Sequence, residues 1–117
     1  MNLTDSQQFN VDLTNFNGPL DVLLDLAKSQ KVDLEKISVT KLADQFHTFI
    51  TTAKDINLEL ASEYLLMATW LTYLKSKLLL PESDEEEFKI FEVAEKLKLQ
   101  LKKLELIRLL SDQMLKR

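Results

Sequence analysis

The chain has 117 residues, of which 45% are hydrophobic and 29% charged, and its formal net charge is -4. This length and composition suit one small globular domain, and the acidic balance disfavours direct binding to DNA phosphates. The absence of cysteine excludes disulfides, thiolate metal sites and thiol catalysis. One glycine and two prolines are too few for a hairpin-rich β fold, so we expect an all-α protein.

The N-terminal residues are expected to form a loose leader and then a strand. Residues 1–8 are polar and contain neither Lys nor Arg, so we expect a flexible leader and no signal peptide. Phe9, Val11 and Leu13 then alternate with polar residues, which predicts one short β-strand. A lone strand needs a partner, either the helices of this chain or another chain. No stretch is apolar enough to predict a membrane span.

The first two helices are expected in the segment that follows. Pro19 suits the first position of a helix, and apolar residues recur at helical spacing after it, which predicts a helix over 19–30. A short turn is expected at 33–36. Ser38 is suited to cap a second helix over 39–53.

Two longer helices complete the prediction. The third is expected over 58–79, capped by Asn57 and ended by Pro81. Ser83 and Glu86 have the spacing of a capping box, which predicts a fourth helix that continues to the C-terminus. The acidic run at its start favours the positive end of the helix dipole and is far more typical of a solvated turn than of a metal site.

Both long helices carry more apolar surface than one face can hold. On the third helix the expected core stripe is Leu60, Tyr64, Met67, Leu71, Leu74 and Leu78. A second stripe, flanked by Glu59, Glu63 and Lys77, consists of Leu66, Trp70 and Tyr73. Either the fourth helix or the N-terminal strand covers this second stripe, or it is a docking face for a partner helix, a role that suits Trp and Tyr.

The fourth helix shows the same surplus. Its expected core seam is Ile90, Ala94, Leu97, Leu101 and Leu104, close to a heptad pattern. Nearly opposite lie Phe88, Leu99, Leu106 and Leu110. Three short helices cannot hide both seams, so a second copy, a partner protein or neighbouring molecules in a crystal must cover one of them.

The sequence has almost none of the cysteine, histidine and glycine residues that nucleophile, metal and phosphate sites use, and its many carboxylates are interpreted as charges on helix surfaces. His47 is the only histidine, and a single histidine beside apolar helix positions is usually structural. Gly18 is the only glycine, so no glycine-rich loop can hold phosphate. We therefore expect no enzymatic activity, no metal and no cofactor.

Ordered motifs point to a family. They begin with FNGPLDVLL at 16–24, which resembles the F-x-G-P-L-D-L-L-L signature of segregation and condensation protein A (ScpA), a bacterial kleisin. The likeness continues through LELASEYLLMA at 58–68 and ends with LKSKLLLP at 74–81, similar to the family's I-K-S-R-x-L-L-P. The signature residues are Phe16, Gly18, Pro19, Leu20, Asp21, Lys75, Ser76 and Pro81. For Gly18, Pro19 and Asp21 we expect a role in maintaining the fold.

The resemblance implies a non-enzymatic adaptor of the SMC–ScpA–ScpB complex, which condenses and segregates chromosomes. Residues 9–81 would bind the coiled-coil neck of an SMC ATPase, with Glu63, Leu66, Trp70, Tyr73 and Lys77 as the expected contacts. Residues 82–117 would hold the ScpB dimer or self-associate as a homodimer, through Phe88, Leu99, Leu106 and Leu110. A cytoplasmic, nucleoid-associated location follows, with DNA reached only through the complex and no contact with membranes.

Two points depart from the family or compete with it. The sequence ends at Arg117 without the family's winged-helix domain, so we expect a fragment or a short form that cannot close a ring alone. Trp70 also replaces a residue that is small in many relatives. The competing interpretation is a small helical regulatory or DNA-binding module, which the acidic charge disfavours.

Overall fold

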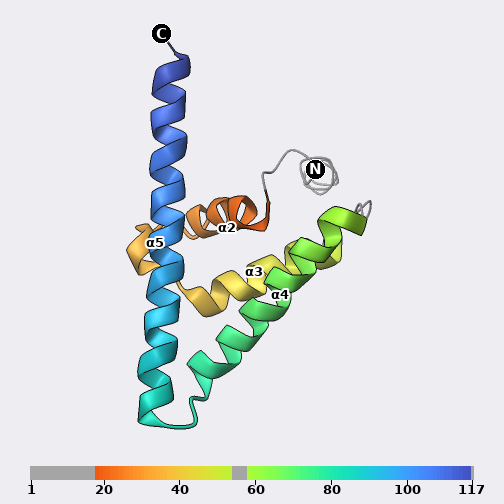
Figure 1. Cartoon of the computed structure of the whole chain (residues 1–117), viewed down its shortest axis with the longest axis vertical. Coiled ribbons are helices and arrows are strands. Elements are labelled where there is room, and N and C mark those ends of the chain that lie inside the picture. The colour runs from red at the N-terminus through yellow and green to blue at the C-terminus, as the bar shows by residue number, and fades with distance from the viewer. Residues whose placement is uncertain (1–17, 54–57, 117) are drawn as a thin grey trace.

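The computed structural model describes residues 18–53 and 58–116, which form four α-helices and one 3-10 turn. In chain order these are α2 (Pro19–Lys28), η2 (Leu34–Lys36), α3 (Val39–Thr52), α4 (Leu58–Leu79) and α5 (Asp84–Leu115) (Figure 1). Within those ranges there is no strand, so the all-α prediction is confirmed. The predicted leader, the strand at 9–13, Phe16 and the Asn57 cap lie outside the described residues.

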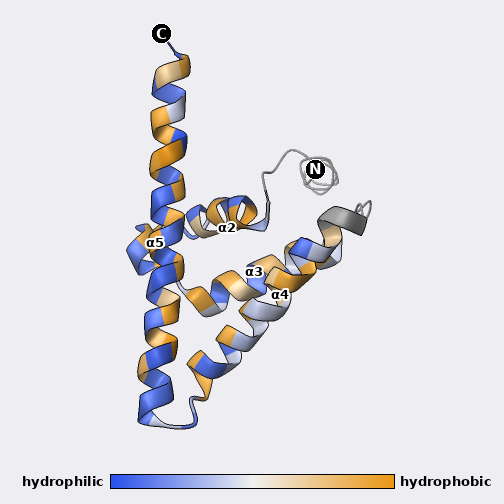
Figure 2. Ribbon diagram, viewed as in Figure 1, coloured by the Kyte–Doolittle hydropathy of each residue, from blue (hydrophilic) through white to orange (hydrophobic). Residues whose placement is uncertain are grey.

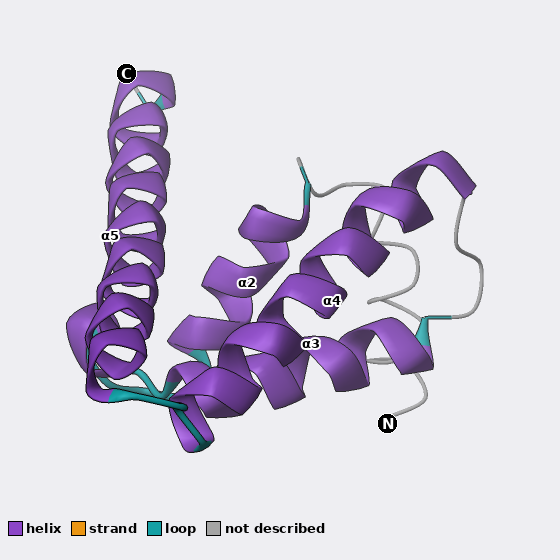
Figure 3. Cartoon of the chain, turned by 60° about the horizontal axis from the view of Figure 1, so that its bottom comes forward, coloured by secondary structure: helices purple, strands orange, loops and turns teal. Residues whose placement is uncertain are grey.

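The helices form a short bundle beside one long helix. Helices α2, α3 and α4 pack together, and α5 runs upright along one side of them (Figure 1). A short connection at residues 80–83 joins α4 to α5, so the two long helices diverge from one end as the arms of a V. The C-terminal end of α5 projects beyond the bundle, as a second view also shows (Figure 3).

Capping side chains define where two of these helices begin. The Ser38 hydroxyl accepts a hydrogen bond from the Lys41 backbone N–H at 3.1 Å, and the Ser83 hydroxyl accepts one from the Glu86 N–H at 3.1 Å. Both predicted caps are therefore confirmed. The Glu86 carboxylate in turn accepts from the backbone N–H of Glu82 at 2.6 Å, one residue before the position that a regular capping box would use.

Helix α2 differs from its prediction at the C-terminal end. Gly18 precedes it with φ 135°, a conformation that glycine adopts far more readily than other residues. The helix ends at Lys28, two residues before the predicted end, because tighter bonds follow: the N–H groups of Gln30 and Lys31 donate to the carbonyls three residues before them. Lys31 then takes φ 61°, which stops the helix.

One hydrophobic core joins all the helices. The aromatic rings of Phe46, Phe49 and Tyr64 stack at its centre, with centroids 6.2–6.4 Å apart. The inner seam of α5 is part of this core, because Ile90, Ala94, Leu97 and Leu101 are all buried. The remaining buried residues are Val22, Leu23, Leu24, Ala27, Leu34, Ile37, Val39, Leu42, Ala43, Leu71 and Leu74.

Candidate protein-interaction surfaces

The inner face of α4 packs as the sequence predicts. Tyr64, Leu71 and Leu74 are buried, and Met67 and Leu78 are partly buried against the core. The side chain of Leu60 lies outside the described residues. This face already satisfies the helix's contacts with α2, α3 and α5, so any apolar residue on the opposite face is surplus to the fold.

The second stripe of α4 is exposed. Leu66 is 72% exposed, Tyr73 is 55% exposed and Trp70 is 39% exposed. Cover of the stripe by α5 is therefore wrong for Leu66 and Tyr73, while Trp70 is partly covered. The alternative in which the N-terminal strand covers it falls on residues outside those described. Trp70 is partly covered because it lines a groove of about 420 Å³ between α4 and α5. The lining residues are Glu63, Leu66, Met67, Trp70, Leu97 and Gln100.

Lys77, predicted as a contact for a partner, makes contacts within the chain. Its ammonium lies 3.2 Å from the Glu86 carboxylate and 3.5 Å from that of Glu82, and 5.8 Å from the centroid of the Tyr73 ring. The hydrogen bond to Glu86 raises the pKa of Lys77. These contacts tie the end of α4 to the start of α5 across the connection. Lys77 thus has a structural role, and its contact with a partner stays a prediction.

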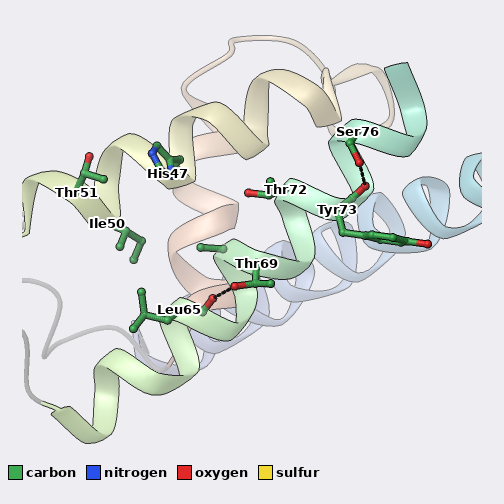
Figure 4. Close-up of a pocket in the computed structure, with 9 residues that line it drawn as sticks. His47, Ile50, Thr51, Leu65, Thr69, Thr72, Tyr73 and Ser76 are labelled. Carbon is green, nitrogen blue, oxygen red and sulfur yellow. Dashed lines mark hydrogen bonds between the residues drawn. The ribbon is translucent and has the colours of Figure 1, made fainter. Parts of the chain in front are cut away.

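A second groove runs along the other side of α4. It has a volume of about 550 Å³ and is open to solvent on the surface between α3 and α4 (Figure 4). The hydroxyls of Thr69 and Ser76 donate to the carbonyls of Leu65 and Tyr73, each at 2.9 Å, so they bond to their own helix. The lining residues are His47, Ile50, Thr51, Leu65, Ala68, Thr69, Thr72, Tyr73 and Ser76.

Sequence reasoning missed this second groove. Leu65 is 54% exposed and stands beside Leu66, which indicates an apolar surface wider than the predicted stripe. His47 lies at the surface of the groove, on the α3 side. The spacing of Leu65 and Thr69, four residues apart, was the available signal, because such residues share a helix face.

The family signature residues mostly stabilise the fold. Asp21 accepts hydrogen bonds from Arg108, and Lys75 lies 2.5 Å from Asp44. Leu20 packs against the core. Pro19 occupies the first turn of α2, Ser76 bonds back to the Tyr73 carbonyl and Pro81 lies in the connection that follows α4. These contacts agree with the expected structural role of Asp21.

The outer side of α5 is exposed along its whole length. The four predicted residues are all uncovered: Phe88 is 62% exposed, Leu99 51%, Leu106 56% and Leu110 55%. Apolar segments recur on α5 as far as its C-terminal end (Figure 2). Further large apolar residues, which the sequence reasoning did not single out, are exposed on the same helix: Phe91, Ile107, Leu109, Met114 and Leu115.

Neither a cluster of metal-ligating side chains nor a membrane-spanning helix occurs in the described part of the chain. In residues 18–53 and 58–116, no three His, Cys, Asp or Glu side chains come together in a way that could hold a metal ion. None of the helices in these ranges has the length and apolar character needed to cross a membrane.

Comparison with known proteins shows which family the chain is similar to. The profile of the family described as Segregation and condensation protein ScpA matches residues 26–113. The chain is 46% identical over 84 residues to Segregation and condensation protein A of Mycoplasma mobile, covering 70% of this chain and 34% of that protein. No solved structure matches the chain.

Two Bacillus proteins with the same name are also similar. The identity is 42% over 79 residues for Bacillus cytotoxicus and 40% over 81 residues for Bacillus pumilus. The matches cover 68% and 69% of this chain but 32% of each relative, so the chain spans about a third of their length. Because the family profile extends over well more than half of the residues, the chain belongs to the segregation and condensation protein ScpA family.

Proposed function

We propose that this chain is a non-enzymatic adaptor, a kleisin, of an SMC–ScpA–ScpB complex that condenses and segregates chromosomes. It docks on the coiled-coil neck of the SMC ATPase through the outer face of α4. The observation that carries this proposal is the exposed row of Leu66, Trp70 and Tyr73 on a helix whose opposite face is buried. Membership in the ScpA family supports the same role.

The geometry of the α4 face fits a helical partner. The row spans about 10 Å along the helix axis, because its ends are seven residues apart and each residue rises about 1.5 Å. Grooves flank α4 on both sides, one shared with α3 and one with α5. Helices pack by fitting ridges into grooves, so a two-helix coiled coil can add to α3 and α4 as a bundle. Trp70 and Tyr73 supply large apolar areas with polar tips.

Binding to an SMC neck fragment tests this proposal directly. The double substitution Leu66→Asp and Trp70→Asp places two charges in the contact, so we expect the affinity measured by calorimetry to fall at least about 100-fold. Neither side chain belongs to the hydrophobic core, so the circular dichroism spectrum should not change. Leu79→Asp is the matched control, because Leu79 is 59% exposed on α4 but lies off the stripe. Full binding by the folded double variant would reject this face.

The region after Pro81 is proposed to hold a second protein, the ScpB dimer. Support comes from the large apolar side chains that α5 leaves exposed. A cytoplasmic, nucleoid-associated location follows from this assembly. DNA is reached only through the complex, in keeping with the net charge of -4. Sedimentation of the chain mixed with ScpB tests the contact, and an unshifted boundary for both proteins would contradict it.

A further inference from the structure

A further groove lies between α2 and α3. It has a volume of about 540 Å³ and is open to solvent. Its most buried lining residues are apolar, since Phe49 of α3 is buried and Leu26 of α2 is half-buried. The residues around this apolar floor form a polar rim: Lys41, Asp44, Gln45, Thr48 and Thr52. An open groove with an apolar floor on a small domain is a candidate binding site.

Two polar residues of the rim already have partners in the chain. The Asp44 carboxylate lies 2.5 Å from the Lys75 ammonium. The Gln45 amide donates to the Ser29 hydroxyl at 2.8 Å and accepts from the Gln30 amide at 2.9 Å. These groups gain little from a polar ligand, whereas an occupant that covers the apolar floor removes its surface from water. The groove therefore favours an occupant that is apolar on its inner side and polar on its outer side.

The segment that precedes α2 has this character and lies at one end of the groove. Residues 1–17 precede the described part of the chain and join α2 at Gly18. Within them, Phe9, Val11 and Leu13 alternate with polar residues, so the predicted strand carries them on one face. Helices α2 and α3 are in contact and run in opposite directions (Figure 1), so the C-terminal end of α3 lies toward the start of α2.

The lengths of the strand, the groove and the connecting residues agree. The three apolar residues of the strand span about 13 Å, and the part of α3 that lines the groove rises about 17 Å. From Gly18 to Leu26, α2 rises about 12 Å. Residues 14–17 reach about 13 Å when extended, which is enough to bring Leu13 to the groove.

We propose that residues 9–13 of this chain bind as an extended strand in the groove between α2 and α3, parallel to α3. Phe9 lies at the end of the groove formed by Lys41, and Leu13 lies at the end formed by Thr52. The polar residues of the strand face water. One edge of its backbone also faces water, so its N–H and C=O groups stay hydrogen-bonded.

The chain's own strand has an advantage over any other occupant. A connection of four residues holds the strand near the groove at an effective concentration in the range of about 1 mM or more, which a second copy in dilute solution does not reach. The groove shares no lining residue with the two grooves beside α4. The inference thus goes beyond the proposed docking on the SMC neck, and either proposal can fail alone.

Paired substitutions on the two faces of the strand test the docking. Val11→Asp places a charge against the apolar floor, so we expect the midpoint of thermal unfolding to fall by at least about 5 °C. Asn10→Asp is the matched control: it adds the same charge to the outer face and should shift the midpoint by less than about 1 °C. Equal midpoints for the two variants would overturn the proposal. Below these midpoints Val11→Asp should still bind the SMC neck fragment, and lost binding would place the strand in that interface and overturn the proposal too.

Crosslinking tests the location of the strand, because the chain has no cysteine of its own. One variant combines Val11→Cys with Thr48→Cys at the groove, and the control combines Val11→Cys with Leu66→Cys on the second stripe of α4; Thr48 and Leu66 are both exposed. With a short bismaleimide, we expect the first variant to crosslink within one chain at least about tenfold faster, because docking raises the effective concentration of the two thiols. Equal rates, or a faster reaction at Leu66, would overturn the proposal. Crosslinked dimers as the main product would also overturn it, since the strand would then bind another chain.

Discussion

At the scale of single residues, Tyr64 combines a favourable ring with an unfavourable hydroxyl. The ring stacks with Phe46 and Phe49 and is 1% exposed. Its buried hydroxyl has no hydrogen-bond partner in the described part of the chain. Burial, and then the nearby charges of Asp21 and Glu63, raises the pKa of Tyr64 to about 12. A buried hydroxyl without a partner costs about 1–3 kcal/mol of stability. The ring of Tyr64 therefore stabilises the fold, and its hydroxyl does not.

Removing this hydroxyl should stabilise the protein and change its response to alkali. The neutral phenol favours the folded state fully below pH 10, and this contribution is lost as the pH rises from 10 to 12, because the unfolded chain ionises first. At pH 11 the loss is about 1.4 kcal/mol. At pH 8 we expect Tyr64→Phe to unfold at a higher urea concentration than the unaltered chain. At pH 11 its free energy of unfolding should not show the loss that ionisation of Tyr64 causes in the unaltered chain.

The exposed Tyr73 provides the control for that measurement. Tyr73→Phe keeps the buried phenol of Tyr64, so its stability should fall between pH 8 and pH 11 as in the unaltered chain. Lysines also titrate in this range, but they are common to all three proteins and cancel in the comparison. An equal alkaline decline for Tyr64→Phe and the unaltered chain would show that burial does not perturb this phenol.

At the scale of elements, ion pairs hold the C-terminal half of α5 against α2 and η2. Arg108 donates to the Asp25 carboxylate at 2.8 Å, to the Asp21 carbonyl at 3.2 Å and to the Asp21 carboxylate. One turn earlier, Glu105 lies 3.5 Å from Lys28. The Arg108 guanidinium is a third exposed and the Asp21 side chain 15% exposed, so water screens this contact less than most surface pairs.

Substituting Arg108 should loosen α5 without unfolding the bundle. Arg108→Ala removes charge-assisted hydrogen bonds that cross between two helices, so we expect the free energy of unfolding to fall by about 1–2 kcal/mol. Amide hydrogen exchange should rise mainly in the part of α5 after Leu101, the last buried residue of the helix. Lys103→Ala is the matched control, because Lys103 is exposed on the same helix. Equal exchange in the two variants would contradict this role for Arg108.

At the scale of the whole molecule, α5 completes the core that the other helices begin. Ile90, Ala94, Leu97 and Leu101 belong to the same buried cluster as the residues of α2, α3 and α4. The division into regions 9–81 and 82–117 remains a prediction, and the shared core makes it testable. Burying one large aliphatic side chain contributes about 1.5–3 kcal/mol, which is a large part of the stability of a small domain.

A chain truncated after Pro81 should therefore lose cooperative folding. Its remaining helices would expose the apolar residues that now pack on the inner seam of α5, so we expect a broad, low thermal transition by circular dichroism. Truncation after Ser111 is the control, because residues 112–116 are exposed and their loss removes no core contact. A sharp transition for the shorter chain, at the temperature of the full chain, would show that residues up to Pro81 fold alone.

Local signals explain why most helix boundaries could be predicted from the sequence. Ser38 and Ser83 are capping residues and Pro81 ends a helix, so α3, α4 and α5 begin or end within about a residue of their predicted positions. The end of α2 was less predictable, because Lys31 adopts a positive φ that the sequence does not favour. The inner stripes were predictable for the same reason as the boundaries, since helical periodicity is a local property.

Long-range contacts explain what sequence reasoning missed. Arg108 and Asp21 are 87 residues apart, and no spacing rule pairs them. Lys77 is predicted as a contact for a partner because it flanks the outer stripe. In the structure the chain turns at Pro81, and Glu82 and Glu86 then form ion pairs with Lys77. The groove between α3 and α4 depends on how two helices lie together, which periodicity within either helix does not reveal.

The connection between α4 and α5 sets the angle between the two long helices. The Lys77 ammonium pairs with Glu82 and Glu86 across it, and both helices contribute to one core, so we expect the angle between α4 and α5 to stay constant. Two proteins bound to the outer faces of α4 and α5 would therefore be held in one relative orientation at this point, even if they are long or flexible elsewhere. The angle between the two helices would then set the orientation of one partner relative to the other.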